Sequence, residues 1–336
     1  MKEMIRTQIC VLALATILIP GLAAAQAEGP ETFGCEANPT GDPIGGGPGY
    51  RRILMSGDFT VRTAKDLLAA LKQAKPGQVV WVPDGVDVDL TEQKYIAIPA
   101  GVTLAGTRGH KDSPGARIFT TQRATTLFAT AGEDVRVTGL RFEGPFAGRD
   151  QIAEDSCFLV TTHFGTEVDN CEIYNWNVDG VAGRRGAAKL RVHHCFIHHC
   201  QRAGLGYGVS LDQCDAYIIA NRFDWCRHHI AATGSPGTSY EAAYNLVLQN
   251  ANGHFFDMHG GRDRGDDTDI AGDWIEIHHN TFQGTQQRAV VIRGVPSQGA
   301  DIHHNWFAKP VKETVVSPGN TRTHRNVYGP DKKLEE

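Results

Sequence analysis

The sequence predicts an all-β protein that folds as a single-stranded parallel β-helix, a solenoid of short stacked strands with one short N-terminal capping helix. Three observations support this fold class. Glycine is frequent, at 38 of 336 residues, whereas only 4 residues are methionine, which favours turns over long helices. A short β-type motif occurs in eight copies along the chain. A single segment near the N-terminus has the apolar spacing of an amphipathic helix.

Charge and composition exclude several classes of protein. The chain carries 33 Lys and Arg against 38 Asp and Glu, a formal net charge of −5, so a general nucleic-acid-binding protein is not expected. Hydrophobic residues make up 41% of the chain, which is enough for a sizeable core and excludes intrinsic disorder.

Residues 1–25 are predicted to be a secretory signal peptide. Lys2 and Arg6 precede an apolar run from Ile9 to Ala24, and small residues follow where cleavage is expected. The run is too short for a convincing membrane span. We therefore expect a secreted or periplasmic protein that is not bound to a membrane. The closed ends of a β-helix favour a monomer.

Three regions are expected after the signal peptide. They are an extended N-terminal arm rich in glycine and proline (26–58), the β-helix (59–330) and a polar tail (331–336). The capping helix is expected over 63–74, where apolar residues recur at helical spacing before Pro76 and Gly77. Short strands are expected at 79–82 and leading into 101–106.

The repeated motif defines the expected coils. Its clearest copies are Ile277–Phe282 and Ile302–Phe307, in which two histidines precede an asparagine. The asparagine position falls at 140, 171, 195, 221, 250, 280, 305 and 326, at intervals of 21 to 31 residues. Repeats of this length are typical of β-helix coils. Asparagines stacked at a turn can hydrogen-bond along the stack, so their presence needs no catalytic explanation.

Two segments near the N-terminus carry a family resemblance. The order of helix, Lys75–Gly85 and Ile98–Gly106 resembles the N-terminal cap and first coils of pectate-lyase-like right-handed β-helices. The resemblance implies a right-handed β-helix and a carbohydrate-active enzyme, commonly a lyase, epimerase or hydrolase acting on a polysaccharide. The chain lacks the aspartate cluster and the Arg-x-Pro-x-x-Arg pattern of the pectate lyases proper. Their calcium-plus-arginine mechanism is therefore not carried over.

Strands that end in glycine predict which residues share a face. The aligned glycines are Gly183, Gly208, Gly234, Gly260 and Gly294. Alternation then points apolar or small residues inward. The outward residues directly before the glycines form a vertical column of Tyr207, Thr233, His259 and Arg293. Asp257 and His229 are expected beside this column.

The loops after Gly234 and Gly260 are expected to form the walls of a cleft over the column. Arginines gather in this part of an otherwise acidic protein, as an anionic sugar chain requires. The predicted substrate-binding residues are Arg227, Thr233, Tyr244, His254, Arg262, Arg264 and Arg288.

The leading hypothesis is a polysaccharide lyase that cleaves a uronic-acid-containing polysaccharide by β-elimination. The reaction needs a neutralised carboxylate, a base for the C5 proton and an acid for the leaving oxygen. The predicted catalytic residues are Arg293, with Arg262 or Arg264, for the carboxylate; His229 or His259, oriented by Asp257, as base; and Tyr207 or Tyr240 as acid.

Three alternatives stay open. A glycoside hydrolase needs two carboxylates, and only Asp257 lies on the predicted face. The second would have to come from Asp179, Asp212, Glu241 or Asp263. A uronate C5-epimerase would use nearly the same groups as the lyase. A non-catalytic glycan-binding β-helix would need an aromatic strip, and the 5 tryptophans do not align on the glycine-ended strands.

Metal binding is weakly indicated. Paired histidines at 193–194, 198–199, 278–279 and 303–304 are most simply explained as histidines on the turn surface. A zinc or copper site is the alternative, but no compact ligand set is evident and no metal-ligating residues are predicted. An acidic run of Asp263, Asp266, Asp267 and Asp269 could hold calcium, so the need for a cofactor stays open.

The cysteines form two pairs at equivalent positions of adjacent coils. Cys171 and Cys195 share the asparagine position, and Cys200 and Cys226 each follow that position by five residues. Stacking would bring each pair within disulfide range, and export would permit oxidation. Disulfides and buried free thiols are both open at this point.

Overall fold

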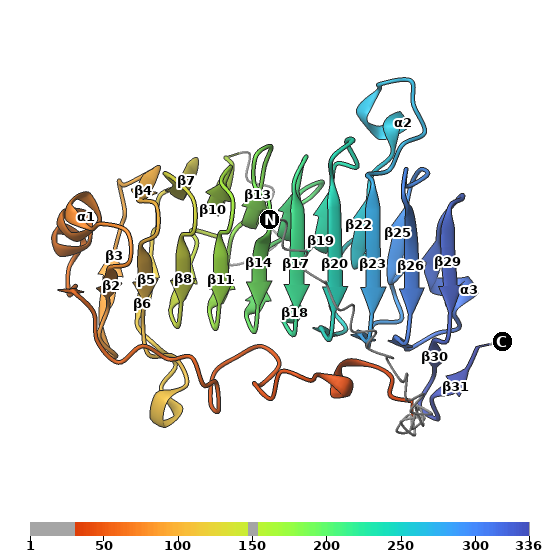
Figure 1. The fold of residues 1–336 in the computed structure, drawn as a ribbon, viewed down its shortest axis with the longest axis horizontal. Coiled ribbons are helices and arrows are strands. Elements are labelled where there is room, and N and C mark those ends of the chain that lie inside the picture. The colour runs from red at the N-terminus through yellow and green to blue at the C-terminus, as the bar shows by residue number, and fades with distance from the viewer. Residues whose placement is uncertain (1–30, 147–153, 336) are drawn as a thin grey trace, which may run out of the picture. The chain divides into compact units, whose positions relative to one another are not determined.

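The protein forms a right-handed parallel β-helix, as the repeat and the resemblance predicted. The computed structural model describes residues 31–146 and 154–335, so the predicted signal peptide lies outside the described residues. Within these ranges, strands of successive coils stack into three sheets in which neighbours run parallel, except for the last pair, β30 with β31. Figure 1 shows the coils stacked along one axis.

Most coils contribute one strand to each sheet. The first sheet contains β1 (Phe59–Thr60), β2 (Val79–Trp81), β5 (Thr103–Ala105), β8 (Arg136–Thr138), β11 (Glu167–Asp169), β14 (Leu190–His193), β17 (Asp215–Ile219), β20 (Ser239–Ala243), β23 (Trp274–His278), β26 (Gly299–His303) and β29 (Thr321–His324). The second, here called the site sheet, contains β4 (Ile96–Ile98), β7 (Thr125–Thr130), β10 (Ser156–Thr161), β13 (Asp179–Gly183), β16 (Tyr207–Leu211), β19 (His228–Ala232), β22 (Phe256–Met258), β25 (Val290–Ile292) and β28 (Val315–Val316). The third contains β3 (Asp87–Asp89), β6 (Arg117–Phe119), β9 (Arg141–Glu143), β12 (Glu172–Tyr174), β15 (Phe196–His198), β18 (Arg222–Asp224), β21 (Leu246–Val247), β24 (Thr281–Phe282), β27 (Trp306–Phe307), β30 (Val327–Tyr328) and β31 (Lys333–Leu334).

Helix α1 (Ala64–Gln73) lies at the N-terminal end of the stack, where the sequence predicted a capping helix (Figure 1). Thr63 and Asp66 form a capping box that satisfies the first backbone N–H groups. Leu67 and Leu71 are buried against the first coils. The other helices are short: η1 (Cys35–Ala37), η2 (His110–Asp112), α2 (Gly261–Arg264) and α3 (Val311–Thr314). Among the described residues, none of the helices is long and apolar enough to cross a membrane.

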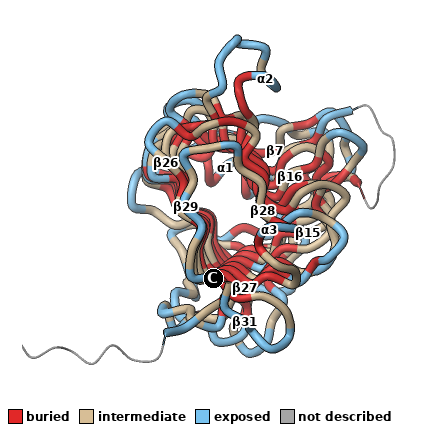
Figure 2. The backbone as a smooth tube through the Cα atoms, turned by 90° about the vertical axis from the view of Figure 1, so that its right-hand side faces the viewer, coloured by how far each residue is buried: buried red, intermediate tan, exposed pale blue. Residues whose placement is uncertain are grey.

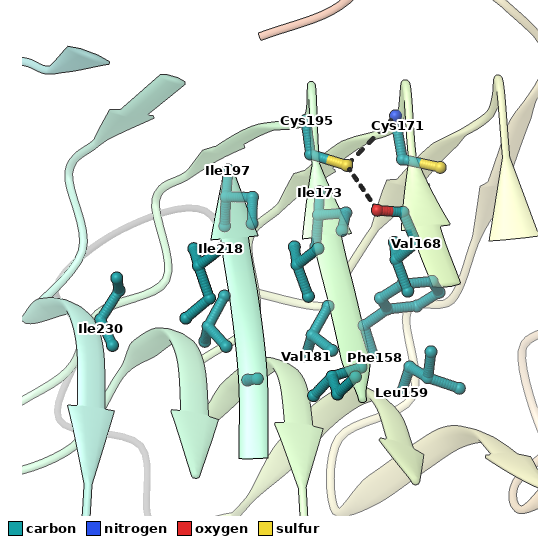
Figure 3. Close-up of a cluster of buried hydrophobic side chains, with 14 of the residues drawn as sticks. Phe158, Leu159, Val168, Cys171, Ile173, Val181, Cys195, Ile197, Ile218 and Ile230 are labelled. Atoms are coloured by element: carbon teal, nitrogen blue, oxygen red, sulfur yellow. Dashed lines mark hydrogen bonds between the residues drawn. The ribbon is translucent and has the colours of Figure 1, made fainter. Parts of the chain in front are cut away.

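The core runs along the inside of the coils. Figure 2 shows buried residues lining the inner side of the stacked strands, and Figure 3 shows isoleucines and valines of neighbouring coils packed there. Equivalent positions form columns of similar side chains, such as Ile173 beside Ile197. Stacking like on like lets each coil bury the apolar face of its neighbour.

A bulge in the site sheet turns two consecutive residues inward in the coils from β7 to β19. At β19, the N–H groups of His229 and Ile230 both donate to the carbonyl of Phe255, at 2.8 and 3.2 Å. The pairing passes from Tyr207–His228 to Val209–Ile230, so the two residues between them have no paired partner in the register. Both strands advance by two residues between these pairs, so the register is kept, but His229 and Ile230 are both buried and strict alternation of faces fails.

Because of this bulge, His229 lies on the inner side of the site sheet. Its side chain is 0% exposed and lies inside the coils, with its ring 5.5 Å from that of Phe223 and 5.3 Å from that of Phe255. The prediction that His229 faces outward is therefore wrong. The outward residue at this coil is His228, one position earlier.

The predicted outer column is correct for three of its four members. Ala232 pairs with Met258 and Met258 with Ile292, which places Thr233, His259 and Arg293 on successive coils. Tyr207 was assigned to the wrong row, because it pairs with His228 rather than lying beside Thr233. Gly183 and Gly208 lie within their strands, whereas Gly234, Gly260 and Gly294 follow theirs by two residues, so aligning on glycine misplaced the two earlier coils.

Asparagines form a buried hydrogen-bond ladder. The backbone N–H of Asn221 donates to Oδ1 of Asn245 at 2.9 Å, and the same contact joins Asn245 to Asn280, Asn280 to Asn305 and Asn305 to Asn326. Each Nδ2 donates to a carbonyl of the preceding coil. The ladder was predicted, but its fifth position is Asn245, whereas Asn250 instead bonds to Asp224.

The ladder continues through cysteines. The N–H of Cys195 donates to Oδ1 of Asn221, and that of Cys171 contacts Sγ of Cys195 at 3.5 Å, as Figure 3 shows. Cys171, Cys195, Cys200 and Cys226 are all free, buried thiols. Of the two possibilities that the sequence left open, the structure therefore has the interior thiols.

The N-terminal arm lies along the turns that carry the paired histidines, and Figure 1 shows it crossing successive coils. Thr40 Oγ1 lies 2.9 Å from Nε2 of His194, and the ring of Phe33 stacks on that of His304 at 5.6 Å. Gly47 N–H donates to Oδ1 of Asn170 at 2.8 Å. Within each histidine pair the two Nδ1 atoms lie 2.7 to 2.9 Å apart and form a hydrogen bond.

Removing one ladder asparagine should destabilise the fold. Asn280→Ala leaves the buried N–H of Asn245 without its acceptor and the carbonyl of Ala242 without its donor. We expect a loss of about 2–4 kcal/mol in the free energy of unfolding, measured by urea denaturation. Asn250→Ala, outside the ladder, should cost less than about 1 kcal/mol. Equal losses for the two variants would contradict the ladder's role.

Replacing His229 should make the protein more resistant to acid. Burial lowers the pKa of His229 to about 3, and both ring nitrogens lack a partner among the described residues. Below about pH 6.5 the unfolded chain binds a proton that the folded protein does not, so folding stability falls as pH falls. His229→Leu should remove a penalty of roughly 2 kcal/mol at pH 5.

Thermal unfolding at neutral and mildly acidic pH measures this effect. The wild type should lose more of its melting temperature on acidification than His229→Leu does. His110→Leu, on the η2 turn, should keep the wild-type pH dependence. If His229→Leu also keeps that dependence, the interior histidine does not titrate as argued.

Candidate active site

The outer face of the site sheet presents three columns of side chains, because the bulge recurs at the same point in the coils from β7 to β19. The first column contains Cys157, Asp179, Tyr207 and His228. The second contains Val160, Ala182, Ser210, Ala231, Asp257 and Val291. Two residues further along the strands, the third contains Arg184, Asp212, Thr233, His259 and Arg293. Polar groups from all three columns meet around Asp257.

Asp257 is a buried carboxylate at the centre of a cluster of N–H groups. Its residue is 1% exposed, and Arg293 donates to both oxygens, with Nε at 2.9 Å from Oδ1 and Nη2 at 2.6 Å from Oδ2. His259 Nε2 lies 3.2 Å from Oδ2. Burial alone would raise the pKa of Asp257, but the His259 hydrogen bond and the charges of His228 and Arg293 lower it to about 2. Asp257 is therefore ionised at neutral pH.

His228 lies on the other side of Asp257. Its Nδ1–H donates to the carbonyl of His254 at 2.5 Å, and Nε2 lies 3.3 Å from Asp257 Oδ2 without hydrogen-bond geometry. Burial lowers the pKa of His228 to about 4 even though Asp257 opposes the shift. His228 is thus neutral at pH 7. Sequence reasoning missed it, and the available signal was the neighbouring pair His228–His229, of which only one can face outward.

Tyr207 and Arg227 extend the cluster. The Tyr207 ring stacks on that of His228 at 5.8 Å, and Arg227 Nη1 donates to the Tyr207 hydroxyl at 3.3 Å. Burial raises the pKa of Tyr207, so the phenol keeps its proton at neutral pH. The half-buried ring of His254 lies 6.0 Å from that of His228. These predicted site residues are therefore gathered around Asp257.

A hollow of about 280 Å³ lies next to the cluster on the same face. Its floor includes the small side chains of Ser210 and Ala231, and Tyr207 and His259 line its sides. The His259 side chain is 31% exposed and is the accessible end of the His259–Asp257 pair. A small ligand in the hollow would therefore meet an imidazole and a phenol together.

The other predicted residues have different places. Thr233 lines the hollow and donates to Asp212 at 2.5 Å. Tyr240 is buried on β20 rather than facing a cleft, and burial and Asp257 raise its pKa. Tyr244 stacks on His279 at a turn. Arg262 and Arg288 are exposed.

Arg264 supports the loop after β22 instead of pointing freely at a ligand. Its guanidinium donates to the carbonyls of Thr233 and Ile270, each at 3.0 Å, and to Asp266 at 2.7 Å. These bonds fix the loop against the coil below. Arg264 therefore has a structural role in this loop, and its predicted contact with substrate stays a prediction.

One group of residues in the described ranges has the spacing of a metal site. Glu167, Asp169 and His193 offer ligand atoms within 4.8 Å of one another. Arg52, Arg136 and Arg191 already pair with these carboxylates. A guanidinium-neutralised cluster has little attraction for a cation, so these residues fit an ion-pair network. In the acidic run, Asp263 pairs with Arg293 and Asp266 with Arg264.

Comparisons with known proteins identify the fold. No family model and no curated protein matches the chain. Among solved structures, an alginate lyase from Paenibacillus sp. str. FPU-7 has a TM-score of 0.59 at 17% identity, covering 82% of this chain and 96% of that one. A mannuronan C-5 epimerase module from Azotobacter vinelandii has a TM-score of 0.41 at 10% identity, covering 78% and 84%. At these identities the likeness shows the β-helix fold.

Breaking the central ion pair should cost much more than breaking an exposed one. Asp257→Ala leaves Arg293 partly buried without its bidentate partner. We expect a loss of about 3–5 kcal/mol in the free energy of unfolding. The control Asp155→Ala removes the exposed partner of Arg202 and should cost about 0–1 kcal/mol. Chemical denaturation measures both, and a similar small loss for each would contradict a strong central pair.

Proposed function

We propose that this protein is an exported polysaccharide lyase that cleaves a uronic-acid-containing polysaccharide by β-elimination. The observation that carries the proposal is the cluster of Asp257, His259 and Arg293 beside a hollow that Tyr207 also lines. The cluster supplies each group that the elimination needs. The alginate lyase fold likeness makes alginate the first substrate to test. Export rests on the signal-peptide-like sequence of residues 1–25.

His259 is the proposed base. Asp257 can only accept, so the contact at 3.2 Å places a ring proton of His259 on Nε2. The Nδ1 lone pair is then free to take the C5 proton of the uronate. Asp257 also stabilises the imidazolium that forms. Because the His259 side chain is part-exposed, a sugar ring in the hollow can reach it.

Arg293 is the proposed partner of the substrate carboxylate. A guanidinium has five N–H groups, and Arg293 uses three of them on Asp257 and Asp263. The remaining N–H groups can bind the uronate carboxylate. Their charge stabilises the enolate that develops when the C5 proton leaves.

Tyr207 is the proposed acid. Its hydroxyl oxygen accepts a hydrogen bond from Arg227, so its own proton is available to donate. As His259 takes the C5 proton, the C–H electrons form the C4–C5 double bond and the C4–O bond breaks. The leaving oxygen takes the Tyr207 proton, and the Arg227 charge stabilises the resulting phenolate.

The site favours elimination over hydrolysis. A glycosidase needs one carboxyl group that is protonated near neutral pH. Asp257 cannot supply it, because its pKa is about 2 and both oxygens already accept hydrogen bonds. A C5-epimerase would start with the same proton abstraction, and its product contains no double bond. The two activities are therefore separated by their products.

His259→Ala should abolish turnover while leaving binding largely intact. We expect kcat to fall about 10²–10⁴-fold, because a positioned base is lost. The assay follows the ultraviolet absorbance of unsaturated uronate during incubation with alginate, its mannuronate and guluronate blocks, pectate and glycosaminoglycans, with and without a chelator. Equilibrium binding of oligouronates measures the retained affinity.

His324→Ala is the matched control, since His324 pairs with Asp301 far along the stack. It should keep wild-type kcat. Reducing ends without new absorbance would replace the lyase by a hydrolase. Interconversion of mannuronate and guluronate without cleavage would indicate an epimerase. Full activity of His259→Ala would overturn the assignment of the base.

A further inference from the structure

We propose that Asp179 and Arg184 form a second sugar-binding subsite at the far end of the hollow, where they recognise the sugar unit on the leaving-group side of the cleaved bond. This inference rests on the proposed function and extends it from the reacting sugar to the bound chain. Both residues line the same hollow as His259.

Asp179 is a buried carboxylate with one oxygen unused. It is 1% exposed, and its Oδ2 accepts from Arg184 Nη2 at 2.8 Å and from Cys157 Sγ at 3.5 Å. Its Oδ1 is buried and has no hydrogen-bond partner among the described residues. An unmet charged acceptor is costly in a purely structural ion pair. A sugar hydroxyl in the hollow would donate to this oxygen and remove the cost.

Arg184 supplies the complementary donors. It reaches from the third column across the second, where Nη1 donates to Ser210 Oγ at 2.9 Å. Its side chain is 33% exposed, and its Nε–H bonds to nothing within the described ranges. Acceptor and donor together suit a uronate, which offers hydroxyl groups and a carboxylate.

The separation between Asp179 and the Asp257 cluster determines what this subsite can do. Asp179 lies on β13, and Asp257 on β22, with β16 and β19 between them. At about 4.8 Å per coil, three steps are roughly 14 Å, too far for either residue to reach the C5 proton and carboxylate at His259 and Arg293, whereas Asp179 lies one coil from the proposed acid Tyr207. The pair would therefore hold the chain in place, and its binding energy would act on the reacting unit only through that positioning.

The two Arg–Asp pairs bracket the floor of the hollow. Arg293 with Asp257 lies next to His259, which lines one end of the hollow, and Arg184 with Asp179 lines the other end. Between them the second column holds only the small Ser210 and Ala231. A sugar chain lying along this column would cross the coils and meet a cationic group at each end.

The test compares oligouronates of increasing length. In the wild type, kcat/KM should rise with length once the chain reaches the subsite. Asp179→Asn and Arg184→Gln should each lower kcat/KM for long oligomers about tenfold, mainly through KM, so that the advantage of long over short substrates is lost. Arg185→Gln, whose side chain bonds to Gln213, should keep that advantage.

Binding separates this inference from the proposed reaction. In an inactive His259→Ala background, adding Asp179→Asn should weaken the binding of long oligouronates about tenfold, whether or not the wild type is a lyase. Thermal unfolding and the milder substitution Arg184→Lys test whether a loss of oligouronate binding comes from misfolding. Unchanged affinity for long oligomers, or an equal loss for short ones, would overturn the subsite. Absence of unsaturated product with intact wild-type binding would overturn only the reaction.

Discussion

The bulge shared by the coils of the site sheet is the constraint on which the site depends. From β7 to β19 alternation breaks at the same point of each strand, so two consecutive residues face the core and the outward positions fall into three columns. His228 is outside and His229 inside for this reason alone. Parallel pairing repeats the bulge from coil to coil. Asp257 is therefore placed between His228 of the first column and His259 and Arg293 of the third.

Much of the fold was predictable from local sequence patterns. The predictions that failed also failed for local reasons, at particular residues. The turn motif, the capping helix and the column of Thr233, His259 and Arg293 follow from spacing. The row of Tyr207 and the ladder position of Asn245 do not. Gly208 lies inside β16 instead of after it, and the motif at Asn245 begins with Ala242 where other copies have Ile or Val. A period of two carries no information across a bulge. The adjacent histidines at β19 made the choice of outward residue ambiguous.

Electrostatics explains why one carboxylate dominates the site. Asp257 is buried, which by itself disfavours its charge, yet Arg293 and His259 contact it directly and His228 lies alongside. These contacts offset the cost of burying the Asp257 charge, and the carboxylate holds the contacting groups in fixed directions. A rigid acceptor of this kind orients an imidazole and a guanidinium without taking part in proton transfer. Asp179 is the contrasting case, since only one of its oxygens is satisfied by protein groups.

The N-terminal arm has a consequence for how the solenoid unfolds. In a stack of repeats each coil touches only its neighbours, so end coils can unravel independently and stability is a sum of local terms. The arm adds contacts of long sequence separation, joining Cys35 to Thr281 and Gly47 to Asn170. Coils that do not touch one another thereby share a common strap. Opening one of them requires partial release of the arm, which makes the whole cylinder behave more like a single cooperative unit than its one-dimensional architecture implies.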